Sequence, residues 1–159
     1  MKGNDMQERK DNWSVGQWMT QNPSSVSSDT PVKSAFYRMR REGYRHLPVV
    51  DDGRLVGIVT DRDLRRPDLT TEPDGWNDYY RLDDQTEVRH VMTERVDTLS
   101  PSDPLEKALS TFIEWKFGAM PVLDKNGDLL GILTSYDLLR AFQVALAESA
   151  DLLRSEGSR

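Results

Sequence analysis

The chain has 159 residues, of which 36% are hydrophobic and 30% charged, with a formal net charge of −6 and no cysteine. This length suits one ordinary domain or two half-sized domains that share a core, and the absence of cysteine excludes disulfides, thiolate catalysis and cysteine-ligated metals. The acidic balance argues against nucleic acid as the main partner, because a phosphate backbone is bound by a net basic surface.

Residues 1–14 form a polar N-terminal extension without the apolar stretch of a secretory signal. Nowhere in the chain does an apolar run approach the roughly 20 residues that a membrane span needs. We therefore expect a cytoplasmic protein that does not insert into a membrane.

From residue 15 onward, the sequence is organised as two copies of one pattern. The segment GIVTDRD at Gly57–Asp63 returns as GILTSYD at Gly131–Asp137, and Met19–Thr20 returns as Met92–Thr93. Such self-similarity is the signature of a repeated structural unit. The predicted division of the chain is a first repeat over 15–66, a linker over 67–87, a second repeat over 88–147, and a helix end with a tail over 148–159.

Each repeat is predicted to contain a helix that begins where a polar residue precedes a proline, at Thr30–Pro31 and at Asp103–Pro104. A polar N-cap followed by proline at the first helical position is typical of helix starts, because the N–H that proline lacks would be unbonded there. Gly43 and Gly118 are the expected C-terminal stops. One apolar stripe at helical spacing runs along each helix, formed by Val32, Ala35, Phe36 and Met39 in the first and by Leu105, Ala108, Leu109 and Phe112 in the second.

Strands are predicted on both sides of each helix. The runs HLPVV and AMPVL precede turns at Asp52–Gly53 and Asn126–Gly127, which lead into RLVGIV and DLLGIL. Asp-Gly or Asn-Gly between apolar runs predicts a hairpin. Short β-branched stretches near Ser24–Ser27 and Val96–Leu99 indicate a further strand before each helix. Each repeat therefore reads strand, helix, strand, strand, helix, and the fold class is α+β with two pseudo-symmetric repeats.

The last helix of the second repeat is predicted to be longer than its counterpart in the first. It begins near Ser135 and carries apolar residues at helical spacing as far as Leu153. Its far end has more apolar surface than a small pair of repeats covers. Either a second subunit covers it, or the N-terminal segment packs back onto it with Trp13 and Trp18.

The tetrads Thr60–Asp63 and Thr134–Asp137 admit two interpretations. Ser/Thr-x-x-Glu after a strand is a capping box, and an aspartate at the fourth position gives a shortened version of it. Alternatively, a helix start offers free N–H groups and a positive dipole end to a phosphate, and the aspartate can accept hydrogen bonds from both vicinal hydroxyls of a ribose. The occurrence in both repeats, each time after a strand whose glycine permits close approach, favours a ligand.

The pattern as a whole resembles a tandem pair of CBS domains, often called a Bateman module. The resemblance rests on the WMT and VMT openings, on HLPVVD and AMPVLD at the second strand, and on GIVTDRDL and GILTSYDL before the last helix, over about Val15 to Ala147. It implies repeats packed through their sheets into a disc, commonly dimerised, with clefts that hold AMP, ADP, ATP, S-adenosylmethionine, NAD or cyclic di-AMP. We expect no required cofactor, although Asp61 and Asp63 could hold a magnesium that accompanies a nucleotide; two such carboxylates at a helix start are ordinarily solvated or capping.

The resemblance also implies roles for single residues. Thr60 and Asp63 would bind the ribose in one cleft, and Thr134 and Asp137 would bind it in the other. Adenine would lie against four residues that are equally well explained as core: Val26 and Leu47 in one half, and Leu99 and Met120 in the other.

Phosphate binding is expected mainly in the first repeat. The resemblance implies contacts from Arg45 and His46, with Arg62 as a weaker candidate, whereas the second repeat has Gly118–Ala119 and Tyr136 at the matching places. A partly buried, hydrogen-bonded histidine is the alternative for His46.

Three classes of function remain. The first is a regulatory sensor of an adenosine-containing ligand, whose conformational change is read by a separate effector protein, since the chain encodes no effector domain. The second is a dimerisation or docking module with empty clefts, in which the tetrads are only caps. An enzyme is least favoured, because the two histidines are far apart and no nucleophile or metal-binding motif occurs, so we assign no catalytic residue and no metal ligand.

Overall fold

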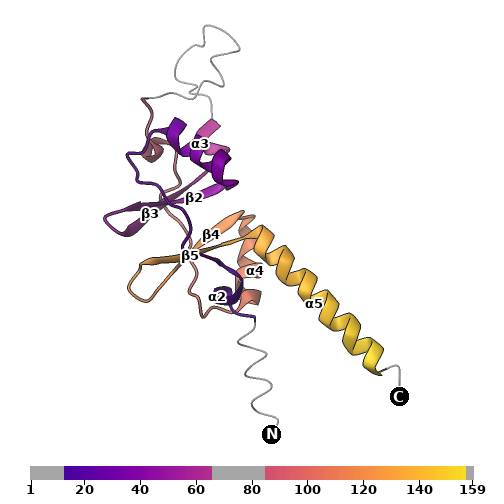
Figure 1. Ribbon diagram of the computed structural model, residues 1–159. Coiled ribbons are helices and arrows are strands. Elements are labelled where there is room, and N and C mark those ends of the chain that lie inside the picture. The colour runs from indigo at the N-terminus through magenta and orange to yellow at the C-terminus, as the bar shows by residue number, and fades with distance from the viewer. Residues whose placement is uncertain (1–12, 66–84, 157–159) are drawn as a thin grey trace. The chain divides into compact units, whose positions relative to one another are not determined.

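The computed structural model describes residues 13–65 and 85–156 (Figure 1). These residues form two compact units. Unit 1 consists of the described residues of Met1–Asn22, Thr98–Lys125 and Leu130–Arg159, and unit 2 of those of Pro23–Asp97 and Asn126–Leu129. The segment that opens the chain therefore belongs to the unit that contains most of the second repeat.

Unit 2 is built around a hairpin and one helix. Strands β2 and β3 are antiparallel, with His46 opposite Thr60. Asp52 and Gly53 in the turn have φ values of 48° and 78°, as a two-residue hairpin of type I′ requires, which confirms the predicted hairpin. The elements are α3 (Val32–Glu42), β2 (His46–Asp51), β3 (Arg54–Thr60) and the 3₁₀ helices η1 (Asp63–Arg65) and η3 (Val88–His90). Its buried core is made of Val26, Val32, Ala35, Met39, Leu47, Val49, Val59, Leu64 and Val88.

Unit 1 contains a three-stranded sheet in the order β1-β5-β4. The first strand comes from the N-terminal segment and is antiparallel to β5, with Thr20 opposite Ile132. The elements are α2 (Val15–Trp18), β1 (Thr20–Gln21), α4 (Leu105–Trp115), β4 (Ala119–Leu123), β5 (Leu129–Thr134) and α5 (Ser135–Glu156). Its buried core is made of Val15, Leu99, Leu105, Ala108, Phe112, Met120, Val122, Leu133 and Ala141.

The strand predicted before each helix is reduced to a single bridge. Val26 forms one parallel bridge with Val49, and Leu99 forms the equivalent bridge with Val122. Each residue is buried and hydrogen-bonded at the edge of a hairpin, but its neighbours do not continue the ladder. The predicted strands are therefore wrong in extent, although their central residues are paired.

Both predicted helix starts are one residue too early. Pro31 and Pro104 are N-caps with extended backbone, and neither cap makes a side-chain hydrogen bond. The first helical N–H groups are satisfied from elsewhere in the same unit, since Val32 N donates to Thr86 O and Leu105 N donates to Trp13 O, both at 2.8 Å. A polar cap side chain is therefore not needed at these starts.

The helix ends differ between the units. Gly43 is the left-handed C-cap of α3, at φ 75°, as predicted. The expected stop at Gly118 is wrong, because α4 ends at Trp115, three residues earlier, and its C-cap Lys116 has the left-handed conformation at φ 55°. Of the predicted last helix of the first repeat, the part of the chain that the structure describes contains the three-residue η1, whereas α5 has 22 residues. The mixture of helices and strands confirms the α+β class.

Candidate functional site

In unit 2, the tetrad Thr60–Asp63 lies where β3 ends and η1 begins. Oδ2 of Asp63 accepts hydrogen bonds from Thr60 N at 3.1 Å and from Thr60 Oγ1 at 2.7 Å. Thr60 Oγ1 in turn accepts a hydrogen bond from Asp63 N at 3.2 Å. These reciprocal contacts are those of a capping box.

In unit 1, the tetrad Thr134–Asp137 has the same three contacts at the start of α5. Oδ2 of Asp137 accepts from Thr134 N at 2.9 Å and from Thr134 Oγ1 at 2.6 Å, and Asp137 N donates to Thr134 Oγ1 at 3.4 Å. The burial of the two carboxyl groups differs, because Asp137 is only 4% exposed while Asp63 is half-buried.

These contacts change what the tetrads can offer to a ligand. The N–H groups of the threonine and the aspartate are already bonded, so they do not form the open anion site that a helix start suggests. The dipole argument also fails for Asp63, because η1 has only three residues. The carboxylates nevertheless keep one free acceptor, because all the capping contacts use Oδ2 and leave Oδ1 unbonded. Among the described residues, every fully buried side-chain polar atom has a hydrogen-bond partner. Oδ1 of Asp137 has none, so it reaches the surface. Ribose binding by Thr60, Asp63, Thr134 and Asp137 stays a prediction.

The basic residues predicted for phosphate lie beside the tetrad of unit 2. Asp61 N donates to Arg45 O at 3.1 Å, next to the pairing of His46 with Thr60. In unit 1, Ser135 N donates to Gly118 O at 3.1 Å, so the two units are built alike at this place.

His46 is half-buried in this arrangement. Burial lowers the pKa of its imidazole, and Arg45 adds to the lowering, while the carboxylates of Asp61 and Asp63 partly oppose it. The imidazole is therefore neutral at pH 7 and has one N–H to donate. Phosphate contact by Arg45, His46 and Arg62 stays a prediction.

The other arginines near the tetrad differ in availability. Arg65 is bound to Asp61, with Nη2 at 2.8 Å from Oδ2 and Nε at 3.0 Å from the backbone oxygen. Arg62 is exposed and makes no ion pair with another described residue, and Arg66 lies outside the described residues. The carboxylate of Asp61 is thus already occupied by the ion pair with Arg65. Within 13–65 and 85–156, there is no group of three or more metal-ligating side chains.

The four residues predicted to contact adenine are all buried. Their exposed fractions are 5% for Val26, 0% for Leu47, 4% for Leu99 and 2% for Met120. Val26 and Leu47 belong to the core of unit 2, and Leu99 and Met120 to that of unit 1. Each unit thus contains the two residues predicted to contact adenine in its own half. The contact with adenine stays a prediction.

The repeated glycines of the G-I-x-T motif permit another segment of the same chain, and not a ligand, to approach the backbone closely. A Cβ at Gly57 would lie 2.7 Å from Met92 Sδ and 3.0 Å from Thr93 O. A Cβ at Gly131 would meet Met19 and Thr20 in the same manner. The Met-Thr opening of each repeat therefore packs on the glycine of the other repeat, within one unit.

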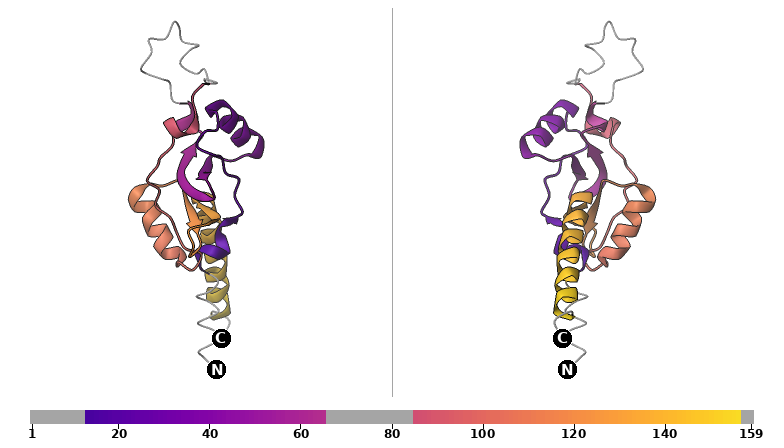
Figure 2. Two further views of the ribbon diagram at one scale, coloured as in Figure 1. Left: turned by 90° about the vertical axis from the view of Figure 1, so that its left-hand side faces the viewer. Right: turned by 90° about the vertical axis from the view of Figure 1, so that its right-hand side faces the viewer.

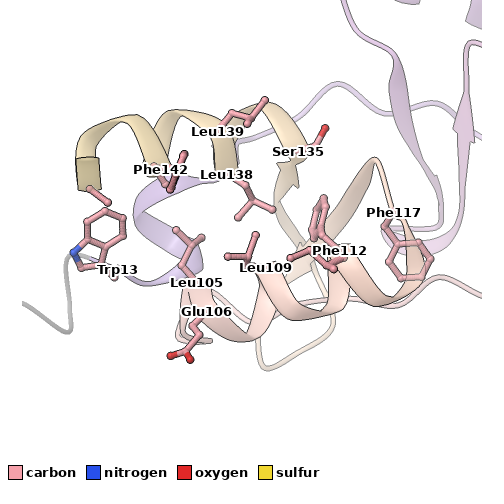
Figure 3. Close-up of a pocket in the computed structure, with 13 residues that line it drawn as sticks. Trp13, Leu105, Glu106, Leu109, Phe112, Phe117, Ser135, Leu138, Leu139 and Phe142 are labelled. Atoms are coloured by element: carbon pink, nitrogen blue, oxygen red, sulfur yellow. The ribbon is translucent and has the colours of Figure 1, made fainter. Parts of the chain in front are cut away.

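Unit 1 also carries an apolar groove of about 820 Å³ between α4 and α5. Figure 3 shows Leu105 and Leu109 of α4 facing Leu138 and Phe142 of α5, with Trp13 at one end. Trp13 stacks on Trp18 at a centroid distance of 5.5 Å and lines the groove together with Phe142 and Ala145, so the N-terminal segment does pack beside α5. It leaves several large apolar side chains exposed: Leu109 by 45%, Ile113 by 69%, Leu139 by 65%, Phe142 by 60% and Leu146 by 55%.

This groove could be predicted only in part from the sequence. The predicted apolar stripe of α4 includes Leu109, but this side chain is exposed, because the face of α4 that the core covers is narrower than the pattern of apolar residues. Ile113 follows Leu109 by four residues and so lies on the same edge of the helix, where the two widen the apolar face beyond the part that the core covers.

No helix of the described residues is long and apolar enough to cross a membrane. A family model described as CBS domain matches the chain twice, at residues 15–68 and 88–144. The chain belongs to the CBS domain family. A CBS domain-containing protein of Dictyostelium discoideum is 34% identical over 127 residues, which are 79% of this chain and 88% of that protein. The chain spans only 43% and 46% of the length of two further curated relatives, the uncharacterized proteins MJ0188 and MJ1225 of Methanocaldococcus jannaschii.

Solved structures of CBS pairs are similar to this chain. CBSX2 of Arabidopsis thaliana in complex with AMP has a TM-score of 0.70 at 33% identity, covering 84% of this chain and 98% of that one. The CBS domain pair of protein MJ0100 in complex with 5′-methylthioadenosine and S-adenosyl-L-methionine has a TM-score of 0.69 at 25% identity, covering 83% and 97%.

Proposed function

We propose that this CBS protein is a regulatory module that binds adenosine-containing nucleotides at its Thr-x-x-Asp sites and passes the signal to a separate effector protein by a change of conformation. One observation carries the proposal: each unit brings a carboxylate with an unused oxygen together with its own buried apolar residues. Similar CBS pairs are bound to AMP, and to 5′-methylthioadenosine and S-adenosyl-L-methionine, in their crystal structures. The proposed role is binding, without catalysis.

The second candidate is a docking module in which the tetrads are only caps. It is favoured by the complete capping contacts of both tetrads. The two candidates differ in what the carboxylates of Asp63 and Asp137 do beyond capping.

Calorimetric titration of AMP, ADP, ATP, S-adenosylmethionine and NAD into wild type and into the double variant Asp63→Asn/Asp137→Asn separates the candidates. Two hydrogen bonds to a charged acceptor, at about 1.5 kcal/mol each, correspond to a loss of roughly 100-fold in affinity. We expect at least one compound to bind wild type and to be lost in the double variant. If none binds wild type, and the double variant only melts at a lower temperature, the docking module is the better account.

We further propose that the protein is a homodimer whose copies associate through the groove between α4 and α5. Figures 1 and 2 show α5 running past α4 and away from the sheet of its unit. Its 22 residues span about 33 Å, whereas the 11 residues of α4 span about 16 Å. The exposed side chains of Val144 and Leu146 on this projecting part have no cover in the described part of unit 1.

The composition of the chain favours a second copy as the cover. The segment before Trp13 has only two apolar residues, Met1 and Met6, so it cannot supply an apolar surface of this size. A twofold axis would place the same patch on both copies, so that α5 of one copy lies in the groove of the other. Helices that expose apolar residues on one face are typical of such four-helix contacts.

A further inference from the structure

The two Thr-x-x-Asp sites share one frame but have different surroundings. The frame consists of the Thr–Asp contacts, the buried apolar residues and a backbone hydrogen bond of 3.1 Å, which joins Asp61 N to Arg45 O in unit 2 and Ser135 N to Gly118 O in unit 1. Around this frame, four equivalent positions differ, occupied by Arg45, His46, Asp61 and Arg62 in unit 2 and by Gly118, Ala119, Ser135 and Tyr136 in unit 1.

The surroundings in unit 2 suit an anion. Arg45 and Arg62 are exposed, and neither makes an ion pair with another described residue. The one carboxylate among the four positions, Asp61, is already paired with Arg65 at 2.8 Å. Two guanidinium groups therefore remain available, and guanidinium binds phosphate oxygens through strong, charge-assisted hydrogen bonds. The half-buried imidazole of His46 adds a further donor beside them.

The surroundings in unit 1 do not suit an anion. None of the four positions carries a charge, and Asp137 is only 4% exposed. A phosphate placed here would lose water and meet a carboxylate of like charge, with no cation at these positions to offset the cost. The nearest cationic residues in the sequence, Lys116 and Arg140, lie outside the four positions. Small side chains at Gly118–Ala119 and the aromatic ring of Tyr136, which is 69% exposed, suit an uncharged group instead.

We propose that the two sites select different adenosine compounds, an inference that rests on the proposed function. The site of unit 2 takes an adenosine with an anionic 5′ substituent, a phosphate. The site of unit 1 takes an adenosine with an uncharged 5′ substituent, such as a thioether. The shared frame recognises the nucleoside, and the charge at the four differing positions selects the substituent.

The test uses two probes, AMP and 5′-methylthioadenosine, in calorimetric titrations of the full chain. We expect each to bind wild type with one site per chain. Asp63→Asn should lower the affinity for AMP roughly 100-fold and leave the affinity for 5′-methylthioadenosine within about 3-fold of the wild-type value. Asp137→Asn should have the reverse effect on the two affinities. Melting curves of the unliganded variants show whether each is folded at the temperature of titration.

A second variant separates the charge from the frame. Arg45→Gly/His46→Ala gives unit 2 the residues of unit 1 at two positions. It should lower the affinity for AMP at least about 10-fold and leave the affinity for 5′-methylthioadenosine unchanged. Arg40→Ala removes the same formal charge from an exposed position on α3 and should leave both affinities unchanged.

The outcomes separate this inference from the proposed function. The selectivity is overturned if AMP fills two sites per chain or if its binding depends on Asp137. It is also overturned if the binding of 5′-methylthioadenosine depends on Asp63, or if this compound does not bind. In each of these cases the proposal of nucleotide binding stands. If neither probe binds wild type, and none of AMP, ADP, ATP, S-adenosylmethionine and NAD does either, the proposed function itself fails.

Discussion

At the scale of single residues, His46 links folding to pH. Burial lowers its pKa in the folded protein below the ordinary value of 6.5. Between these two values, the unfolded chain binds more protons than the folded one, so stability rises with pH. The contribution is complete above about pH 6.5 and is lost as the pH falls through the folded pKa. The groups that face the imidazole are Asp61, Asp63 and Arg45.

His46→Gln should therefore flatten the pH dependence of stability between about pH 7.5 and 5.5. Urea denaturation midpoints across this range measure the effect. His90→Gln is the matched control, because His90 is the other histidine of the chain and is exposed. A slope unchanged in the His46 variant, or flattened equally in the control, would contradict the assignment.

The Thr–Asp pairs show how far residue patterns determine a site. The capping contacts follow from the spacing of the tetrad, and both units have them. The ion pair between Asp61 and Arg65 was not predicted, because it depends on η1 being a single turn. The exposure of Arg62 and the burial of Asp137 likewise depend on packing around the tetrad, which a local pattern does not contain.

At the scale of elements, the two tetrads cap helices of very different length. Asp137 is buried in the first turn of the 22-residue α5, whereas Asp63 is half-buried and begins the three-residue η1. Asp137→Ala removes a buried carboxylate that two donors of Thr134 bond and should cost about 2 kcal/mol, against about 1 kcal/mol or less for Asp63→Ala. Urea unfolding of both variants without ligand measures the difference. Equal losses would mean that helix length and burial do not set the strength of these caps.

Elements bounded by strong local signals were predictable. The Asp-Gly hairpin and the glycine cap of α3 follow from residues that favour positive φ, and both are present. Elements decided by distant partners were not. The helix starts moved by one residue because Thr86 and Trp13 bond the first N–H groups, and the short β1 went unseen because two residues have no periodicity.

At the scale of the whole molecule, the two halves of the sequence do not coincide with the two compact units. Thr20 pairs with β5 of the second repeat, and Thr93 exchanges backbone hydrogen bonds with Ile58 of the first, at 2.9 and 3.0 Å. Each unit thus needs a segment that lies before the other repeat in the chain. This exchange means that neither repeat, cut out along the sequence, contains all the paired backbone segments of its own unit: the second repeat lacks β1, and the first lacks the bridge residue Thr93.

The proposed homodimer is a property of the whole molecule, because it depends on how two complete chains associate. A charge placed in the groove between α4 and α5 would be buried against apolar side chains of the second copy, at a cost on both sides of the twofold axis. Phe142→Asp removes two buried aromatic contacts, each worth about 1.5–3 kcal/mol, and should weaken association at least about 100-fold.

Sedimentation equilibrium of the wild type and two variants decides the matter. Wild type should be a dimer, and Phe142→Asp a monomer whose isolated fold is kept, because this side chain is already 60% exposed. Tyr37→Asp is the matched control, with an aromatic side chain 58% exposed on α3 of unit 2, and it should remain a dimer. If Tyr37→Asp dissociates and Phe142→Asp does not, the copies associate through unit 2. A wild type that is monomeric at every concentration would leave the groove to a partner of another kind, and the effector protein would then be the first candidate to cover it.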